Sequence, residues 1–300
     1  MRYTEDDVLR FVWNRHEAWR GKPVLDDVVR TRKFTNVFRV LDRGSQYLLS
    51  LMNEYNVDPD EDIVNRLALS YLYRQVNRPD TFDAIIESND GCIPIFDEVT
   101  SAEWIQDVVW PVIDARPGEF LNGAYIILIM TNDKRNLKDK MADIFPGARQ
   151  YLLDVAEEDV LATRVKLLQK TPGLGPFLSM QIATDLGYCP GEPDQENDFI
   201  LPGPGARKGV GYLLNEDGKP ASLAQTRRVI ELFPAHEMPF LPKSGGRYSS
   251  LMDVQNVFCE FSKYVRYKES PVQALEPYQR KEPFDTIIPE QFVIKPLPRS

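Results

Sequence analysis

Residue types that commonly hold metals or form cross-links are scarce in this sequence. The 300 residues include three cysteines, far apart in the chain, and two histidines. Distant cysteines form neither a disulfide framework nor a zinc-binding pattern, so we expect no metal site and a reducing compartment such as the cytoplasm. The sequence also lacks a run of about 18 apolar residues and an apolar N-terminal signal region, so we expect neither a membrane span nor a secretory signal.

An excess of positive charge is missing as well. The net charge is −9, from 36 Lys and Arg against 45 Asp and Glu. Proteins that coat nucleic acid without specificity are usually basic, because neutralising phosphates drives their affinity. Any contact with nucleic acid must therefore come from local groups, such as basic clusters, backbone N–H groups and helix N-termini. Hydrophobic residues make up 43% of the chain, enough for one large core or for two lobes that share a cleft.

What is present is helical periodicity over most of the chain. Thr4-Glu-Asp-Asp7 has the pattern of a capping box at a helix N-terminus. Apolar residues at helical spacing predict further helices at about 61–76, 154–170, 177–186 and 250–267. The β-branched stretch 123–130 fits either a minor strand or a buried helix. We predict a mainly α fold: one helical domain over residues 1–268, with two lobes around a cleft, and a proline-rich tail over 269–300 that packs on the surface.

The most informative motif is Thr171-Pro-Gly-Leu-Gly-Pro176, which lies between two predicted helices and defines a hairpin over about 160–186. Gly173 and Gly175 permit a tight backbone path and leave turn N–H groups uncovered, and Pro176 suits the first position of a helix. Exposed N–H groups and a positive helix end together form a phosphate site. We therefore predict that Thr171, Gly173, Leu174 and Gly175 contact a DNA backbone. The alternative is a helical hairpin used only for packing.

This hairpin resembles that of the helix-hairpin-helix DNA glycosylases. In that superfamily a catalytic aspartate follows the hairpin by a few tens of residues, and the target base is flipped out of the duplex. The resemblance points to Asp198 as the matching acid. Asp194 and Glu196 compete with it on spacing alone.

The residues after Asp198 differ from an ordinary glycosylase. Residues 187–211 are rich in glycine and proline, so we expect a long loop, which is uncommon in a compact domain unless it is functional. Within it, the small residue Gly205 lies close to Arg207 and Lys208. Open backbone beside two cations suits an anionic group such as a phosphate or pyrophosphate. A flexible surface loop with solvated charges is equally consistent with this stretch.

Two further helical stretches carry polar residues. In 34–43, helical spacing would place Thr35, Arg39 and Arg43 on one face, where they and Asn36 could bind base edges or phosphate. A polar network between helices fits this stretch as well. In the last predicted helix, Glu260 and Lys263 are spaced for an ion pair, which we expect to hold the lobes together.

Taken together, several stretches resemble one family, the alpha-glutamyl/putrescinyl thymine pyrophosphorylases, also called amino acid:DNA transferases. Members are known mainly from bacteriophages with hypermodified thymines, and their fold is related to the helix-hairpin-helix glycosylases. The resemblance covers most of residues 8–268, and its specificity lies in the order of the motifs. The stretches that carry it are 11–16, 34–43, 171–188, 198–209 and 253–264.

The resemblance implies a reaction on DNA in the host cytoplasm. An amine from an amino acid or polyamine attacks the exocyclic methylene of a pyrophosphorylated 5-hydroxymethyluracil in double-stranded DNA, and pyrophosphate leaves. Asp198 is then the candidate base, and burial should raise its pKa, because an ordinary aspartate is a weak base. Cations suit the leaving group and polar side chains suit the flipped base. The candidates are Arg207, Lys208, Gly205, Arg39 and Arg43 for pyrophosphate, with Asn36 and Gln181 for the base.

Two other functions remain open at this point. In a true DNA glycosylase, Asp198 would stabilise an oxocarbenium-like sugar while water cleaves the bond. The chain could instead be a non-catalytic DNA-binding helical module, like those fused to base-modifying kinases. Beyond the amine co-substrate we expect no cofactor, although a structural Na⁺ or K⁺ at the hairpin carbonyls is compatible with the motif. The sequence indicates neither which amine is used nor an oligomeric state.

Overall fold

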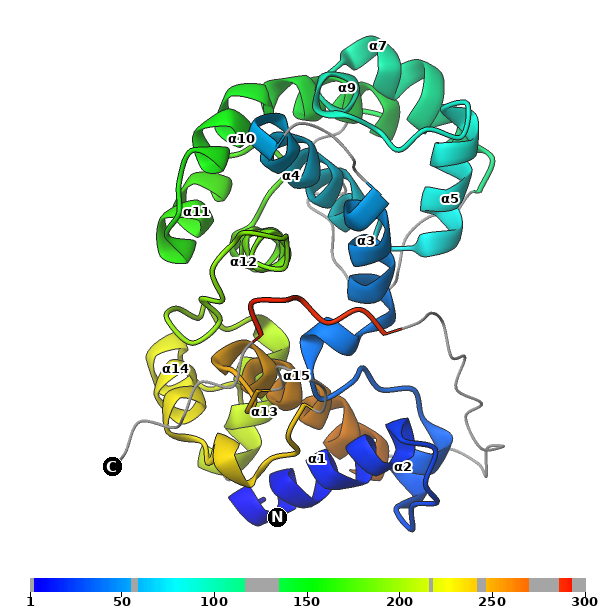
Figure 1. The fold of residues 1–300 in the computed structure, drawn as a ribbon. Helices are drawn as coiled ribbons and strands as arrows, with labels where there is room; N and C mark the ends of the chain where they lie inside the picture. Colours follow the sequence, from blue (N-terminus) through cyan, green and yellow to red (C-terminus); the bar gives the residue numbers. More distant parts are fainter. Residues whose placement is uncertain are drawn as a thin grey trace. The chain divides into compact units, whose positions relative to one another are not determined.

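The computed structural model is built from helices, and the residues that it describes contain no strand (Figure 1). It describes residues 3–54, 59–116, 135–215, 218–241, 247–269 and 286–292. The predicted mainly α fold is therefore confirmed. The chain divides into two compact units: unit 1 comprises Met1–Arg43 and Glu196–Ser300, and unit 2 comprises Gly44–Gln195. The ambiguous stretch 123–130 and most of the tail 269–300 lie outside the described residues.

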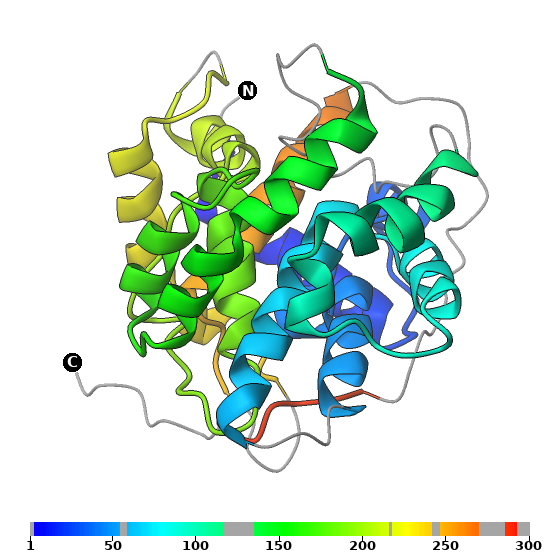
Figure 2. The ribbon, with the colours of Figure 1, turned by 90° about the horizontal axis from the view of Figure 1, so that it is seen from above.

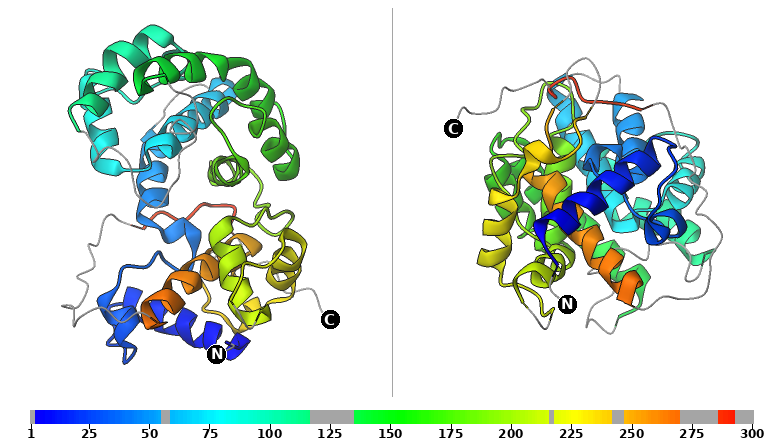
Figure 3. Two further views of the ribbon diagram at one scale, coloured as in Figure 1. Left: turned by 180° about the vertical axis from the view of Figure 1, so that it is seen from behind. Right: turned by 90° about the horizontal axis from the view of Figure 1, so that it is seen from below.

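Unit 1 is organised around its longest helix. Its helices are α1 (Glu5–Trp19), α2 (Asp27–Thr31), η1 (Arg39–Leu41), α13 (Pro204–Leu214), α14 (Leu223–Leu232), η4 (Ala235–Glu237) and α15 (Leu251–Glu269). Helix α15 packs along α13 and also contacts α1, α2 and α14 (Figures 1 and 3). Helices from both ends of the sequence thus share one core, which includes the buried side chains of Phe11, Phe258 and Phe261.

Unit 2 contains a larger set of helices around α4. They are α3 (Arg43–Glu54), α4 (Pro59–Val76), α5 (Pro79–Ser88), α6 (Phe96–Val99), α7 (Ala102–Trp104), η2 (Ile105–Val109), α8 (Trp110–Asp114), α9 (Leu137–Gly147), α10 (Arg149–Ala156), α11 (Leu161–Leu168) and α12 (Pro176–Leu186). Helix α4 contacts α5, α6, α10 and α12 (Figures 1 and 2). Its buried residues include Leu67, Tyr71 and Leu72, as the apolar spacing predicts.

The first helix begins as its sequence predicts. The Thr4 side chain accepts a hydrogen bond from the Asp7 N–H, and the Asp7 carboxylate accepts one from the Thr4 N–H. This reciprocal capping satisfies N–H groups that have no partner within the helix. The helix then buries Val8, Phe11 and Val12. None of the described helices is both long enough and apolar enough to cross a membrane.

A buried ion pair fixes α12 to α4 inside unit 2. The Arg74 Nε and Nη2 atoms donate to the two carboxylate oxygens of Asp185, at 2.6 and 2.7 Å. Both side chains are almost fully buried, and Ser70 Oγ donates to the same carboxylate. Removing one partner of such a pair costs about 3–5 kcal/mol, because it leaves an uncompensated buried charge. The pair therefore sets the position of α12, the second helix of the predicted hairpin.

Three predictions about helices are wrong in detail. The predicted helix 154–170 is two helices, because α10 ends at Ala156 and α11 begins at Leu161. Residues 32–38 are not helical, so Thr35, Arg39 and Arg43 do not share a helix face. The predicted loop 187–211 ends early, because α13 begins at Pro204. Apolar spacing does not reveal where a helix is interrupted, and glycines that let two helices approach resemble loop residues by composition.

Candidate functional site

The hairpin predicted at Thr171 to Pro176 has the expected local structure in unit 2. Helices α11 and α12 are joined by residues 169–175, and Pro176 is the first residue of α12. Gly173 has φ of +79°, in the left-handed region that favours glycine. A Cβ atom at this position would also lie 2.8 Å from Ile144 Cγ2. Backbone conformation and close packing therefore both require glycine at this turn.

The hairpin leaves backbone N–H groups available at the start of α12. Gly175 is the N-cap residue, and no side chain caps this helix. Within the described part of the chain, the N–H groups of Gly173 and Gly175 have no hydrogen-bond partner. The turn itself is held from behind, because Tyr71 Oη donates to the Pro172 carbonyl at 3.0 Å and Thr171 and Leu174 are buried. Such N–H groups at a positive helix end suit an anion.

The second glycine-rich stretch is a helix, not the predicted phosphate-binding loop. Gly203 is the N-cap of α13, and its N–H donates to Gln255 Oε1 at 3.3 Å. A Cβ atom on Gly205 would lie 2.4 Å from Cys259 Sγ, and one on Gly209 would lie 2.0 Å from the Phe258 carbonyl oxygen. These glycines let α13 approach α15 closely. The prediction of an open glycine backbone at Gly205 is therefore wrong.

The two cations of this stretch already have backbone partners. Arg207 Nε donates to the Ala221 carbonyl at 3.0 Å, and Lys208 Nζ donates to the Gly218 carbonyl at 2.6 Å. Lys208 Nζ also lies 5.0 Å from the centroid of the Tyr212 ring. Both side chains are half-buried and hold the segment after α13 against that helix. The structure thus assigns them a packing role, and a role in pyrophosphate binding stays a prediction.

Asp198 is exposed in unit 1, in the turn that precedes α13. The expected burial of this carboxylate is therefore wrong. The competing acid Glu196, two residues earlier, is buried. The other competitor, Asp194, is half-buried in unit 2. Asp198 is the most accessible of the three acids, and its catalytic role stays a prediction.

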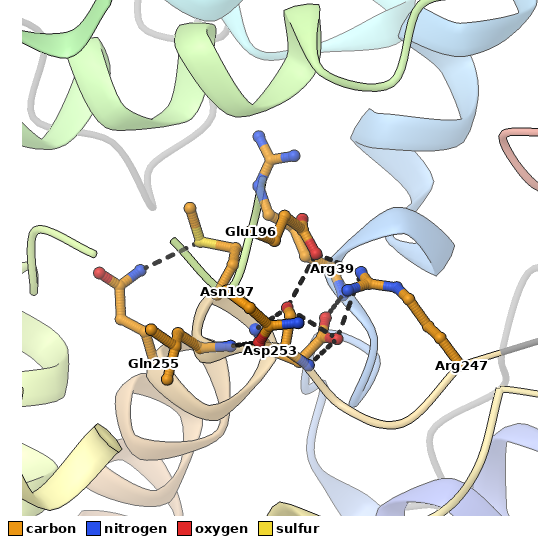
Figure 4. A network of polar contacts seen from close by, with 9 residues as sticks. Arg39, Glu196, Asn197, Arg247, Asp253 and Gln255 are labelled. Atoms are coloured by element: carbon orange, nitrogen blue, oxygen red, sulfur yellow. Dashed lines mark hydrogen bonds and ion pairs between the residues drawn. The ribbon is translucent and has the colours of Figure 1, made fainter. Parts of the chain in front are cut away.

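A buried polar network surrounds Glu196 at the start of α15 (Figure 4). Ser250 Oγ lies 2.8 Å from Glu196 Oε2 and 3.1 Å from Asp253 Oδ2. Arg247 Nη2 forms an ion pair with Glu196 and lies 3.5 Å from Asp253 Oδ2. The Asp253 carboxylate also accepts the N–H groups of Ser250 and Arg39. The network ties together three segments of unit 1 that are distant in sequence: the residues around Arg39, around Glu196 and from Arg247 to Asp253.

The network shifts the acidity of Asp253. Burial raises the pKa of this carboxyl to about 6, and the neighbouring Glu196 adds to the increase, whereas Arg247 and the hydrogen bonds from Ser250 and Arg39 oppose it. Because Asp253 and Glu196 are almost fully buried, they cannot meet a substrate directly. Ser250 and Asp253 form a capping box for α15, since Asp253 N–H also donates to Ser250 Oγ. We therefore interpret the network as a structural anchor.

The polar residues predicted near the N-terminus fall into two groups in the structure. The Asn36 N–H donates to Asp42 Oδ1 at 3.1 Å, and the Asn36 side chain donates to the Leu41 carbonyl. The Asn36 carbonyl in turn accepts a hydrogen bond from Asn256 Nδ2. Arg39 is 4% exposed, in η1 beside the Asp253 network. Asn36 therefore belongs to a polar network, which was the alternative to base binding for this stretch. Arg43 differs, because its side chain is exposed at the start of α3.

Two other predicted residues have clear positions. Gln181 lies on α12 and is buried within unit 2. The predicted ion pair on the last helix is present, because Lys263 Nζ lies 2.5 Å from Glu260 Oε1. Glu260 Oε2 also accepts the Thr35 N–H, so this pair joins segments within unit 1. The other predicted contacts divide between the units: the hairpin and Gln181 belong to unit 2, whereas Asp198, Asn36, Arg39, Arg207 and Lys208 belong to unit 1.

Sequence reasoning missed the Glu196 network. Its signal was available in Ser250-Leu-Met-Asp253, which has the spacing of a capping box directly before an apolar periodic segment. Arg39 and Glu196 are distant in sequence from this capping box, so no local pattern could have indicated them as its partners.

Comparisons with known proteins give a consistent result. Residues 6–274 match the model of a family described as "5-hmdU DNA kinase, helical domain". A curated protein of Bacillus phage SP10, "5-hmdU DNA kinase", is 23% identical over 284 residues, which cover 85% of this chain and 43% of that protein. The chain therefore corresponds to less than half the length of this relative. No solved structure matches the chain significantly.

These comparisons support the expected link to bacteriophage DNA modification in a coarser form, because they do not name the pyrophosphorylase family that the sequence resembles. The family model covers nearly all of the described helices of both units. This chain belongs to the family of the helical domain of 5-hmdU DNA kinases.

Proposed function

We propose that this chain binds double-stranded DNA that carries a 5-hydroxymethyluracil-derived base and acts on that base. The observation that carries the proposal is the hairpin at Thr171 to Pro176, where two N–H groups at a helix N-terminus have no hydrogen-bond partner among the residues that the structure describes. A DNA phosphate is the anion that such a turn suits. The base is inferred from the 5-hmdU DNA kinase of Bacillus phage SP10 and from the family model.

The reaction that we propose is amine transfer. The nitrogen of an amino acid or polyamine attacks the exocyclic methylene carbon of a 5-pyrophosphomethyluracil in DNA. A C–N bond forms, and the C–O bond to the leaving group breaks, so that pyrophosphate departs with the electron pair. The proton released by the amine nitrogen passes to a protein base. The glycosidic bond stays intact throughout, and no metal or redox cofactor is needed for this balance.

Asp198 is our candidate for the protein base. It is exposed, so an amine can reach its carboxylate, whereas Glu196 and Asp253 are buried and committed to the network around Ser250. For the pyrophosphate, Arg43 is the exposed cation among the predicted residues. Arg207 and Lys208 would have to exchange their backbone partners for the leaving group.

A second function is favoured by the coverage of the relative. The chain aligns with 43% of the phage SP10 protein, and the matching family model describes a helical domain of such kinases. A helical module that binds DNA for a separate catalytic domain would align in this way. In that case Asp198 would have no chemical role, and the hairpin would carry the whole function.

One assay separates these functions. The protein is incubated with duplex DNA that contains 5-pyrophosphomethyluracil, with DNA that contains 5-hydroxymethyluracil and with unmodified DNA, each with a set of amino acids and polyamines. The DNA is then digested to nucleosides and analysed by mass spectrometry. We expect an aminated nucleoside from the first DNA alone. Abasic sites would instead indicate a glycosylase, and bound but unchanged DNA would indicate the binding module.

The Asp198→Ala variant tests the proposed base. We expect it to lose amine transfer and to keep its affinity for DNA, because the residue lies outside the hairpin. Asp6→Asn serves as the control, since Asp6 is an exposed acid on α1 that no proposed role involves. Full transfer by the Asp198→Ala variant would exclude this residue as the base.

A further inference from the structure

Four cations of unit 1 lie on or next to residues that contact Tyr267, and the described residues include no ion-pair partner for any of them. Arg32 and Lys33 follow α2, and Arg266 and Lys268 lie in the last turn of α15. The Arg32 and Arg266 guanidinium carbons lie 4.8 and 5.3 Å from the centroid of the Tyr267 ring. We call these four cations and Tyr267 the Tyr267 patch.

Aromatic contacts hold the patch together. The Phe34 ring, one residue after Lys33, lies 6.1 Å from the Tyr267 ring in an edge-to-face arrangement. Lys268 Nζ lies 5.5 Å from the Tyr264 ring and 5.8 Å from the Tyr3 ring. A cation over an aromatic ring gains about 0.5–1 kcal/mol at an exposed site. Arg32, Arg266 and Lys268 thus lie against aromatic rings.

Several other exposed cations of unit 1 pair with acids. Arg10 lies 3.9 Å from Asp7, Arg20 and Lys22 pair with Glu17, and Arg227 pairs with Glu231. In the described part of the chain, none of the four cations of the patch forms an ion pair.

Three of the patch cations, Lys33, Arg266 and Lys268, are exposed, and Arg32 is half-exposed. Asp7 interacts electrostatically with Lys268, Glu269 follows Lys268 in the sequence, and Asp26 accepts a hydrogen bond from Tyr264. In the described residues none of these three acids forms an ion pair with a cation of the patch.

Unpaired cations held close together repel one another, so they gain most from a ligand that brings several negative charges. The phosphate backbone of DNA has this property, and its binding releases condensed counterions in proportion to the phosphates neutralised. We propose that the Tyr267 patch binds the DNA phosphate backbone, as a sequence-independent contact of unit 1 in addition to the hairpin of unit 2. This inference rests on the proposed function, since it takes DNA as the partner.

Salt dependence of binding tests the proposal. The affinity of the full chain for a short duplex is measured over a series of salt concentrations, for the wild type and for a variant with Arg32→Gln, Lys33→Gln, Arg266→Gln and Lys268→Gln. If each cation neutralises one phosphate, the slope of log K against log salt should flatten by about 3.6, which is about 0.9 per contact. Over a fourfold rise in salt, the wild type would then lose about 150-fold more affinity than the variant.

A matched control removes the same charge elsewhere. Arg10→Gln, Arg20→Gln, Lys22→Gln and Arg228→Gln also change the net charge by four units and lie on exposed positions of α1, the segment after it, and α14. We expect this control to change the slope by less than half as much. If the fourfold patch variant does not fold, the pair Lys33→Gln and Lys268→Gln should flatten the slope by about 1.8.

The outcomes separate the two proposals. The role of the patch would be overturned if the patch variant had the same salt slope as the wild type. It would also be overturned if the patch variant and the control flattened the slope equally. The hairpin proposal would stand in both cases. Absence of DNA binding by the wild type would overturn both. Loss of binding to vesicles of anionic lipid, with DNA binding unchanged, would assign the patch to a membrane surface and contradict the proposal.

Discussion

Two glycine-rich segments of this chain look alike in sequence and serve different purposes. In Thr171-Pro-Gly-Leu-Gly-Pro176, glycine provides a left-handed turn, and two of its N–H groups have no partner within the described ranges. In Gly203-Pro-Gly-Ala-Arg-Lys-Gly209, glycine removes side chains so that α13 can approach α15. Each segment places a proline at the first residue of a helix. The number of glycines in a segment does not decide its role. What packs against the glycines decides whether the backbone is available to a ligand or is covered by another helix.

The difference also explains why the binding role rests on the first segment. The Gly203 N–H is already bonded to Gln255, and the Arg207 and Lys208 side chains are bonded to backbone carbonyls. The corresponding groups at Gly173 and Gly175 have no such partners in the described residues. Substitutions in the second segment should therefore affect stability, and substitutions in the first should affect DNA affinity.

The largest expected effect is on stability, from Gly209→Ala. Alanine would gain about 1 kcal/mol in helix propensity, but its Cβ would lie 2.0 Å from the Phe258 carbonyl oxygen. Overpacking of this kind costs about 1–3 kcal/mol and occasionally more, and a clash with backbone places Gly209→Ala at the upper end of this range. We expect a loss of this size in urea unfolding. Gly147→Ala is the control, because its Cβ would meet Pro172 at 3.4 Å, an ordinary contact. Equal stability of the two variants would refute the packing role of Gly209.

A smaller effect on stability concerns the buried network of Glu196, Ser250 and Asp253 at the start of α15. Because the folded-state pKa of Asp253 is raised to about 6, protonation stabilises the fold. This contribution is complete below the unfolded-state pKa near 4 and is lost as the pH rises through about 6. We expect the wild type to lose roughly 2 kcal/mol more than Asp253→Asn between these pH values.

Stability measurements across this pH range check that prediction. Asp198→Asn is the matched control, since Asp198 is exposed and close to Glu196 in sequence. It should follow the wild-type profile. A profile for Asp253→Asn that is parallel to the wild type would mean that Asp253 does not carry the pH dependence.

The smallest expected change in stability comes from Gly173→Ala. A left-handed backbone conformation costs an alanine about 1–2 kcal/mol, and contact with Ile144 adds to this. Gly91→Ala is the control, because Gly91 has φ of +77° and open space around it. Both variants should lose stability from backbone strain, Gly173→Ala should lose more because of Ile144, and Gly173→Ala alone should lose DNA affinity. Equal DNA affinity of the two variants would remove the support for the hairpin.

Sequence reasoning succeeded where a pattern is local. The capping box at Thr4 and the helix after Pro176 both follow from residues within one or two turns. It failed where long-range packing decides. Gly205 and Gly209 indicate a loop by composition, and only the approach of α15 shows why they are glycine in a helix. Asp198 and Glu196 are equivalent by spacing, but Arg247 and Ser250 bury Glu196 and leave Asp198 exposed.

Amide hydrogen exchange of the hairpin tests the central claim most directly. The full chain is measured alone and with a saturating duplex, and exchange is followed for the N–H groups of Gly173, Leu174 and Gly175. If these groups hold a DNA phosphate, the exchange of Gly173 and Gly175 should slow on binding, while amides of α13 should not change. DNA that binds without slowing exchange at Gly173 and Gly175 would contradict the account.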